Sequence, residues 1–340
     1  MNIIRQHPLQ SLNSFGFAVH AEHYVQVGND EQLLEALAAA KTNHWPVFVL
    51  GGGSNLVLTQ DIKGLVIYQS NNTESYEVQP DGTTLVTAGA GKPWHELVLD
   101  TLNHGLVGLE NLSLIPGSTG AAPVQNIGAY GVELVDRLHR VRAFHRPSES
   151  WMNLAPEECA FAYRDSVFKQ NPHDYVITEV SFKLSKDIST VSHYAALNTA
   201  LANQTLPKDN LALAKLISHT VIQIRQAKLP DPSRIGNAGS FFKNPVVSKS
   251  HAETLLATHP QLVHYPQADG QVKLAAGWMI DELGFRGHNA GGVGVHKDQA
   301  LVLVNRGNGD GQALMALASE IVEKVQQVFS VELIVEPVIV

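Results

Sequence analysis

Two glycine-rich segments contain the residues whose types and spacing point most directly to chemistry. Residues 51–55 read GGGSN and follow the apolar run Val47–Leu50, and residues 115–131 read IPGSTGAAPVQNIGAYG. Glycine adopts backbone angles closed to other residues and leaves amide groups bare, so successive N–H groups can surround an oxygen-rich anion. Neither segment has the Gly-Lys-Ser/Thr of a P-loop or the GxGxxG turn of a dinucleotide fold. The pair therefore predicts a site for the pyrophosphate of a large anionic cofactor; the alternative is that these loops only turn corners.

Arg164 and Ser240 are polar residues in short, distinctive contexts. Arg164 lies in YRDSVFK (163–169), and its planar guanidinium matches a carboxylate. The alternative is a surface loop in which Arg164 pairs with Asp165, with little effect on stability. Ser240 lies in NAGSFFKNP (237–245), where a tight turn and the Lys243 ammonium would lower the cost of losing its proton. The alternative is a turn or cap serine; a serine hydrolase is disfavoured because no Gly-x-Ser-x-Gly elbow surrounds Ser240.

The chain ends in VELIVEPVIV (331–340), a β-prone run that carries two carboxylates. Alternation along a strand would put Glu332, Ile334 and Glu336 on one face. A solvated edge strand is the alternative to a chemical role for Glu336.

Helical and strand periodicities define the elements that must position these residues. A hairpin turns at Pro80-Asp81-Gly82, and the helix that follows begins at a proline and ends before Gly105. The expected strands are 24–27, 47–50, 65–67, 75–79, 83–88, 138–144, 175–184 and 301–305, and the expected helices are 30–40, 93–104, 211–226, 274–283 and 312–329. These elements group into three units, residues 1–72, 73–228 and 229–330, with boundaries at the polar run SNNTES (70–75) and at KLPDP (228–232).

Composition narrows the function classes. The 340 residues are 44% hydrophobic and carry a formal net charge of −8, which disfavours a nucleic-acid or membrane-surface protein. A single cysteine, Cys159, indicates a reducing compartment, and no signal peptide or membrane span of about 18 apolar residues is present. The 16 histidines form no HExxH or similar metal pair, so we expect a cytoplasmic protein without a metal site.

Together with the glycine-rich segments, five further motifs resemble those of the UDP-N-acetylenolpyruvoylglucosamine reductase (UDP-N-acetylmuramate dehydrogenase) family. They are YRDSVFK, KLPDP, NAGSFFKNP, YPQADG (265–270) and KLAAGWMID (273–281), and the resemblance runs from about Asn13 to Glu336. It implies an α+β fold: a two-part FAD-binding domain of the vanillyl-alcohol-oxidase and p-cresol-methylhydroxylase type, formed by 1–72 and 73–228, and a third, α+β substrate-binding domain at 229–330. The tail 331–340 would return to the first unit.

The resemblance also implies an activity. NADPH would reduce a non-covalently bound FAD, which would pass hydride to the enolpyruvyl ether of UDP-N-acetylglucosamine to give UDP-N-acetylmuramate for peptidoglycan, and so for cell-wall biogenesis, cell shape and cell division. The enzyme would be a cytoplasmic monomer with no nucleic-acid or membrane partner.

The resemblance assigns catalytic, cofactor-binding and substrate-binding roles to particular residues. Arg164 and Glu336 would act on the substrate carboxyl group, and Ser240 would donate a proton. The residues expected to bind the cofactor are Gly51, Gly52, Gly53, Ser54, Asn55, Leu56, Pro116, Gly117, Ser118, Gly120, Ala121, Pro123, Gln125, Asn126, Gly128, Ala129 and Tyr130. Those expected to bind the substrate are Tyr163, Tyr194, Lys228, Asn244, Tyr265 and Gln299.

Two other functions remain open at this point. One is an oxidase of the same flavin fold with oxygen as acceptor; many of these tether FAD through a histidine near the first glycine-rich segment, which GGGSN lacks. The other is a non-catalytic protein that binds sugar nucleotides, for which Arg164, Ser240 and Glu336 would serve no purpose together.

Overall fold

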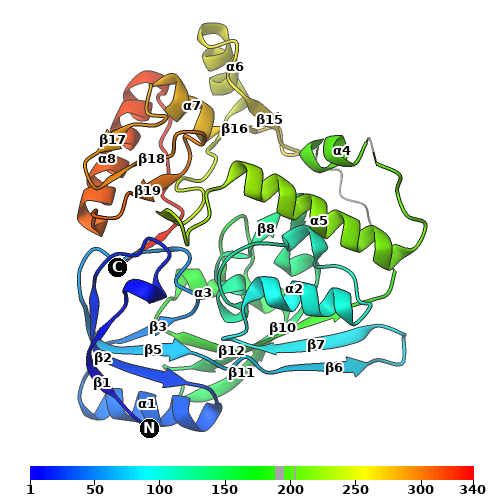
Figure 1. Ribbon diagram of the computed structural model, residues 1–340, viewed down its shortest axis with the longest axis vertical. Helices are drawn as coiled ribbons and strands as arrows, with labels where there is room; N and C mark the ends of the chain where they lie inside the picture. The colour runs from blue at the N-terminus through cyan, green and yellow to red at the C-terminus, as the bar shows by residue number, and fades with distance from the viewer. Residues whose placement is uncertain (188–194, 203) are drawn as a thin grey trace. The chain divides into compact units, whose positions relative to one another are not determined.

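The structure is a computed structural model that describes residues 1–187, 195–202 and 204–340 (Figure 1). It has two compact units, each assembled from separated stretches of chain. The first comprises Met1–His7, Ala21–Gly52 and Ile62–Arg225, and the second comprises Pro8–His20, Gly53–Asp61 and Gln226–Val340. Helices and strands occur in both, in agreement with the predicted α+β class.

The first unit begins with a four-stranded sheet of order β1-β2-β5-β3. Strands β2 and β3 each pair with β5 in parallel, and Asn29 caps the connecting helix α1 by accepting from Gln32 N. The apolar face of α1, with Leu33 and Ala36, packs against Val25 and Ile67 of this sheet. These elements are β1 (Ile4–Pro8), β2 (His20–Val27), α1 (Asp30–Thr42), β3 (Val47–Leu50) and β5 (Ile62–Gln69).

The first unit also contains a five-stranded antiparallel sheet of order β11-β10-β12-β7-β6, with α2 and α5 over one of its faces (Figure 1). The predicted hairpin and the helix after it are confirmed. Trp94 of α2 is 1% exposed and packs edge-on against Phe182 of β12, their ring centroids 5.7 Å apart. The elements are β6 (Glu74–Val78), β7 (Thr84–Gly89), α2 (Trp94–Asn103), β10 (Leu138–His145), β11 (Ser150–Leu154), β12 (Tyr175–Leu184), α4 (Ala195–Leu201) and α5 (Asn210–Lys228).

Short elements occupy the second glycine-rich segment and its surroundings. A 3-10 helix, η3 (Thr119–Gln125), lies within the second glycine-rich segment, and it ends at Asn126 in a left-handed conformation. The others are η2 (Glu110–Leu112), β8 (Gly128–Ala129), β9 (Val132–Glu133), η4 (Leu134–Asp136), η5 (Pro156–Cys159) and α3 (Val167–Gln170).

The second unit surrounds a core that includes Phe241, Phe242, Leu314 and Ile321. Its larger sheets have the strand orders β13-β19-β18-β17 and β14-β16-β15, and β20 pairs with β4 in a separate two-stranded sheet. The elements are η1 (Gln10–Leu12), β4 (Leu56–Val57), β13 (Gly236–Asn237), β14 (Val246–Val247), α6 (Lys249–Thr258), β15 (His264–Pro266), β16 (Val272–Leu274), α7 (Ala276–Glu282), β17 (Asn289–Ala290), β18 (Val293–Val295), β19 (Leu303–Asn305), α8 (Gly311–Phe329) and β20 (Val338–Ile339).

The C-terminal tail departs from the continuous strand that its composition predicts. Only Val338–Ile339 (β20) forms a strand, paired in parallel with Leu56–Val57 (β4), and Val335 forms an isolated antiparallel bridge with Phe242. Pro337 has no N–H to give to a ladder, so pairing breaks between these two contacts. The partner strand of the tail, β4, lies within the first 72 residues of the sequence and belongs to the second compact unit.

No helix among the described residues is long and apolar enough to cross a membrane.

Candidate active site

Residues 51–52 of the first glycine-rich segment touch the second segment within the first unit, and we call residues 51–52 and 115–131 together the glycine-rich cradle. The Gly52 N–H donates to Ser118 Oγ at 3.3 Å. A Cβ on Gly51 would lie 2.5 Å from Ser118 Oγ, and a Cβ on Gly52 would lie 2.7 Å from the Cα of Gly117. Only glycine allows two backbones this close. One ligand can therefore meet both segments, as a shared pyrophosphate site requires.

The β7–α2 loop, residues 90–93, holds the second segment. The Ala90 carbonyl accepts from Gly120 N at 2.9 Å, and the Lys92 carbonyl accepts from both the N–H (2.8 Å) and the hydroxyl (2.9 Å) of Thr119. A Cβ on Gly120 would lie 2.4 Å from Ala90 Cβ. This glycine therefore serves close packing between the loop and η3.

Leu114 lies directly before the second segment, and side chains bind both its backbone N–H and its carbonyl. Its N–H donates to His95 Nδ1 at 3.0 Å, and its carbonyl accepts from Arg225 Nε at 3.2 Å. Burial lowers the pKa of Arg225; Tyr130 opposes this effect, and the positive charge of Arg164 adds to it. Two guanidinium groups thus act on each other beside the cradle, which favours an anion there.

Arg164 is fixed against the second glycine-rich segment. Its Nη2 donates to the Gly128 carbonyl at 2.8 Å, its backbone has a left-handed φ of 56°, and its guanidinium lies 5.4 Å from the ring centroid of Tyr163. The Asp165 carboxylate accepts from Gln170 Nε2 at 3.0 Å. In the first unit, the structure therefore brings the predicted catalytic residue Arg164 into contact with the predicted cofactor-binding residue Gly128.

The side chain of Asn126 is committed to the protein itself. It is 1% exposed; Nδ2 donates to Glu133 Oε2 at 2.8 Å, and Oδ1 accepts from Val135 N at 3.2 Å. A contact between Asn126 and a cofactor would therefore come from the backbone.

In the second unit, the end of the first glycine-rich segment packs on residues near the N-terminus. Gly53 has φ +61°, and a Cβ there would lie 1.9 Å from the Leu12 carbonyl oxygen. Ser14 N donates to the Gly53 carbonyl at 3.0 Å, and Ser14 Oγ donates to the Ser54 carbonyl at 3.2 Å. Gly53 is therefore required both by its backbone angle and by space.

In the second unit, the backbone of Glu336 pairs with the residue that follows Ser240. The Glu336 N–H donates to the carbonyl of Phe241, the residue after Ser240, at 2.9 Å. Phe241 is fully buried, and Asn237 Oδ1 accepts from Gly239 N at 2.9 Å just before the serine. The turn and the two buried phenylalanines of NAGSFFKNP thus fix the backbone on both sides of Ser240.

The predicted substrate-binding residues of the second unit are distributed over several elements. Lys228 is the last residue of α5, Tyr265 lies in β15 and is 51% exposed, and Gln299 lies between β18 and β19. Asn244 Oδ1 accepts from Ala276 N at the start of α7 at 3.0 Å, so that a ligand would meet its Nδ2. Tyr194 lies outside the described residues.

Comparison with known proteins decides the family. A family model for the C-terminal domain of UDP-N-acetylenolpyruvoylglucosamine reductase matches residues 231–340, and one for an FAD binding domain matches residues 21–151. A UDP-N-acetylenolpyruvoylglucosamine reductase of Cupriavidus pinatubonensis (strain JMP 134 / LMG 1197) is 50% identical over 334 residues, 98% of each chain. The chain belongs to the UDP-N-acetylenolpyruvoylglucosamine reductase family.

Other relatives agree. Reductases of the same name from Ralstonia nicotianae and Pseudomonas putida are 48% and 45% identical, over 98% and 97% of this chain and 98% and 96% of theirs. A crystal structure of the reductase from Thermus caldophilus has a TM-score of 0.68 at 24% identity, covering 99% of this chain and 98% of that one, and so shares the fold. The predicted family, α+β fold and oxidoreductase class are confirmed.

The residues present fit an FAD of this family. The match to the FAD binding domain spans both glycine-rich segments, including the contact of Gly52 with Gly117 and Ser118. A separate cavity of about 330 Å³ in the first unit is lined by residues such as Glu110, Arg137 and Lys183 and includes none of the predicted site residues. Within the described part of the chain, no group of three His, Cys, Asp or Glu is arranged to hold a metal ion.

Several residues that build the site carry no recognisable sequence signal. Arg225 lies 111 residues from its partner Leu114 and is one of several cations of α5, so nothing in the local sequence distinguishes it. Lys92 has two acidic partners at different sequence distances, Glu74 and Asp100. Asn13, 6% exposed, folds the loop that meets Gly53 by bonding to the backbone of Leu9 and Phe17.

Proposed function

We propose that this enzyme uses NADPH and non-covalently bound FAD to reduce UDP-N-acetylglucosamine enolpyruvate to UDP-N-acetylmuramate for peptidoglycan synthesis. The observation that carries the proposal is the match of nearly the whole chain to reductases of this name, together with two glycine-rich segments in direct contact. Bound FAD would accept hydride from NADPH and deliver it to the terminal carbon of the enolpyruvyl double bond. That addition leaves negative charge spread into the conjugated carboxyl group, and the protein must stabilise this charge.

We assign Arg164 to the substrate carboxyl group, where its guanidinium would stabilise the developing enolate charge with two hydrogen bonds. Its guanidinium is planar and permanently charged, and its bond to the Gly128 carbonyl and its left-handed backbone orient it before substrate arrives. The nearby positive charge of Arg225 strengthens the field at this position.

Glu336 and Ser240 complete the proposed chemistry. Glu336, protonated, would donate a hydrogen bond to the substrate carboxyl group. Ser240 would donate the proton to the carbon that carries the ether oxygen; a serine is a weak acid, but a carbanion-like intermediate is a strong base. The hydrogen bond from Glu336 N–H to the carbonyl of Phe241, the residue after Ser240, supports a joint role for Glu336 and Ser240.

Lys228, Tyr265, Asn244 and Gln299, with Tyr163 and Tyr194, are proposed to bind the sugar nucleotide. Lys228 is the residue of this set suited to the diphosphate, as a cation, and Asn244 Nδ2 is a suitable donor. We further propose a cytoplasmic monomer with no nucleic-acid or membrane partner. The net charge of −8 supports the absence of such partners, the single cysteine supports a reducing compartment, and the family resemblance suggests a monomer.

Product analysis tests the proposal. The purified protein should be yellow, release its flavin on acid denaturation, and convert the enolpyruvyl substrate, with NADPH, to a product heavier by two hydrogen atoms in mass spectrometry. Flavin that stays with the precipitated protein would contradict non-covalent binding, and consumption of NADPH without this product would contradict the assigned substrate.

A further inference from the structure

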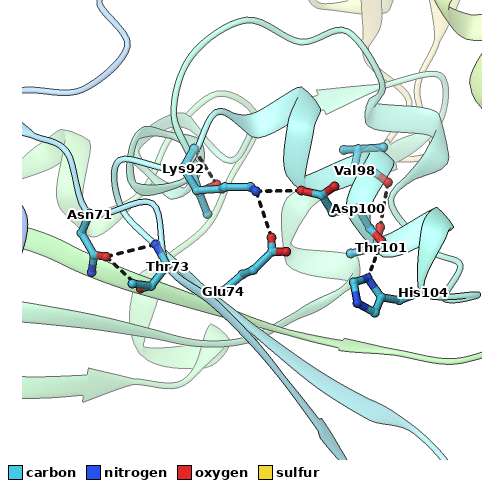
Figure 2. Close-up of polar contacts among 9 residues, drawn as sticks. Asn71, Thr73, Glu74, Lys92, Val98, Asp100, Thr101 and His104 are labelled. Carbon is cyan, nitrogen blue, oxygen red and sulfur yellow. Dashed lines mark hydrogen bonds and ion pairs between the residues drawn. The ribbon is translucent and has the colours of Figure 1, made fainter.

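Lys92 joins three elements through its side chain (Figure 2). Its Nζ lies 2.7 Å from Asp100 Oδ2 of α2 and 3.0 Å from Glu74 Oε2 of β6, and Lys92 itself lies in the loop between β7 and α2. The Lys92 side chain is only 12% exposed, whereas in the Lys183–Asp81 pair of the same unit both side chains are about half exposed. A shielded pair is screened less by water and salt, so it constrains geometry more strongly.

The cluster depends on the lysine charge. Burial by itself favours the neutral amine, but the hydrogen bonds and charges of Asp100 and Glu74 outweigh it and raise the pKa of Lys92. Glu74 Oε2 is a buried atom, so loss of the ammonium would leave a shielded carboxylate beside a second one, Asp100. The expected response is a displacement of β6, α2 or the loop until water reaches these groups.

The backbone of the same residue reaches the glycine-rich cradle. The Lys92 carbonyl accepts two hydrogen bonds from Thr119, from its N–H and from its hydroxyl, and the adjoining Pro93 forms an antiparallel bridge with Ser118. The loop has little freedom elsewhere, since a Cβ on Gly91 would lie 2.6 Å from the carbonyl carbon of Ser70. A displacement of the loop at Lys92 would therefore displace Ser118 and Thr119, which are bonded to it.

We infer that Lys92 is a positioning residue for the flavin site: its ion pairs with Glu74 and Asp100 fix the carbonyl that holds Thr119, and they thereby set the affinity for FAD without contacting it. This inference rests on the proposed function, because it takes FAD as the ligand of the cradle.

The test measures FAD binding and folding separately in full-length apoprotein. FAD is titrated with flavin fluorescence as the readout, and the free energy of unfolding of the apoprotein is measured in urea. We expect Lys92→Met to raise the Kd for FAD at least tenfold and Lys92→Arg, which keeps the charge, to stay within threefold of wild type. Lys183→Met, which removes a comparable but exposed ion pair, is the matched control and should stay within twofold.

A purely structural role gives a different pattern. If Lys92→Met lowers the free energy of unfolding but binds FAD within twofold of wild type, or if Lys92→Arg binds as weakly as Lys92→Met, the inference is wrong. Should Lys92→Met not fold, Asp100→Asn removes one of the two pairs and should raise the Kd at least threefold; an unchanged Kd would overturn the inference. Failure of the wild-type protein to bind FAD would instead overturn the proposed function.

Discussion

Leu114 illustrates how single residues shape this site. Its φ of 59° lies in the left-handed region that non-glycine residues avoid, and the strain is compensated by bonds from both sides of the peptide to His95 and Arg225. The same logic applies at Arg164, whose φ of 56° accompanies a hydrogen bond to the cradle. Such backbone angles occur where surrounding contacts require a particular side-chain direction, and here both residues flank or contact the proposed flavin site.

Replacement of Ser240 by alanine separates the two half-reactions. Because the hydroxyl is assigned only to protonation of the substrate carbon, Ser240→Ala should leave NADPH reduction of the flavin within about threefold of wild type. It should slow flavin reoxidation by the enolpyruvyl substrate by at least about 10²-fold, as is typical for loss of a general acid. Stopped-flow absorbance measures both rates. Ser319→Ala, an exposed position on α8, should change neither, and equal losses in both half-reactions for Ser240→Ala would refute the assigned role.

His95 should make stability depend on pH in a defined direction. Burial, and then the charge of Arg225, lowers the pKa of His95 below its ordinary 6.5, so the unfolded chain binds this proton more readily than the folded protein does. The stability associated with neutral His95 is complete above pH 6.5 and is lost as the pH falls below it. A tenfold difference in proton affinity between the folded and unfolded states corresponds to about 1.4 kcal/mol of stability.

Urea unfolding at pH 7.5 and 5.5 measures this dependence. The acid-induced loss in the free energy of unfolding should be smaller in His95→Gln than in wild type, because the variant has no imidazole to protonate at this position. The exposed His219 supplies the control: His219→Gln should keep the wild-type loss, and the same loss in His95→Gln would contradict the reasoning.

At the scale of elements, the predictable features are those set by local pattern. The helices at α1, α2, α5 and α8 and the β6–β7 hairpin were predictable because apolar periodicity, proline at a helix start and a Pro-Asp-Gly turn act within a few residues. The two glycine-rich segments were predictable as candidates for the same reason. The bonds that join them were not, since the Gly52–Ser118 contact spans 66 residues and no local preference encodes it.

The tail shows the opposite case, in which local preference misleads. Its β-branched residues predict one strand over 331–340. Instead, Val335 pairs with Phe242, β20 pairs with β4, and Pro337 interrupts the pairing between them. The alternation survives in the burial of Val331 and Leu333, at 2% and 3% exposure, while Glu332 and Ile334 are exposed.

The contact between the two glycine-rich segments can be tested by a single methyl group. Gly52→Ala would place a Cβ 2.7 Å from Gly117 Cα, so the segments must separate, and the Kd for FAD should rise at least tenfold. Gly28→Ala is the matched control, because its Cβ would meet only ordinary contacts at 3.6 Å or more, and it should bind FAD like wild type. Equilibrium fluorescence titration distinguishes the two; normal FAD affinity in Gly52→Ala would mean that the cradle does not depend on this approach.

For the whole molecule, the chain order and the compact units do not coincide. Residues 8–20 and 53–61 belong to the second unit although the sequence suggests a continuous N-terminal domain, because Gly53, Leu56 and Val57 pack or pair with residues 12–14 and with β20. Sequence patterns define a unit as a continuous stretch of helices and strands. They therefore do not predict that short segments within one stretch belong to another compact unit. Of the proposed catalytic residues, Arg164 belongs to the first unit, and Ser240 and Glu336 belong to the second.

The most direct test of the proposed function is an anaerobic experiment in one cuvette. NADPH is added to the purified protein to bleach the visible flavin absorbance, and UDP-N-acetylglucosamine enolpyruvate is then added without oxygen. We predict bleaching followed by full recovery of the oxidised flavin band, because the enolpyruvyl substrate accepts the hydride. Bleaching without recovery, followed by rapid reoxidation only when air is admitted, would contradict the proposal and indicate an oxidase of the same fold.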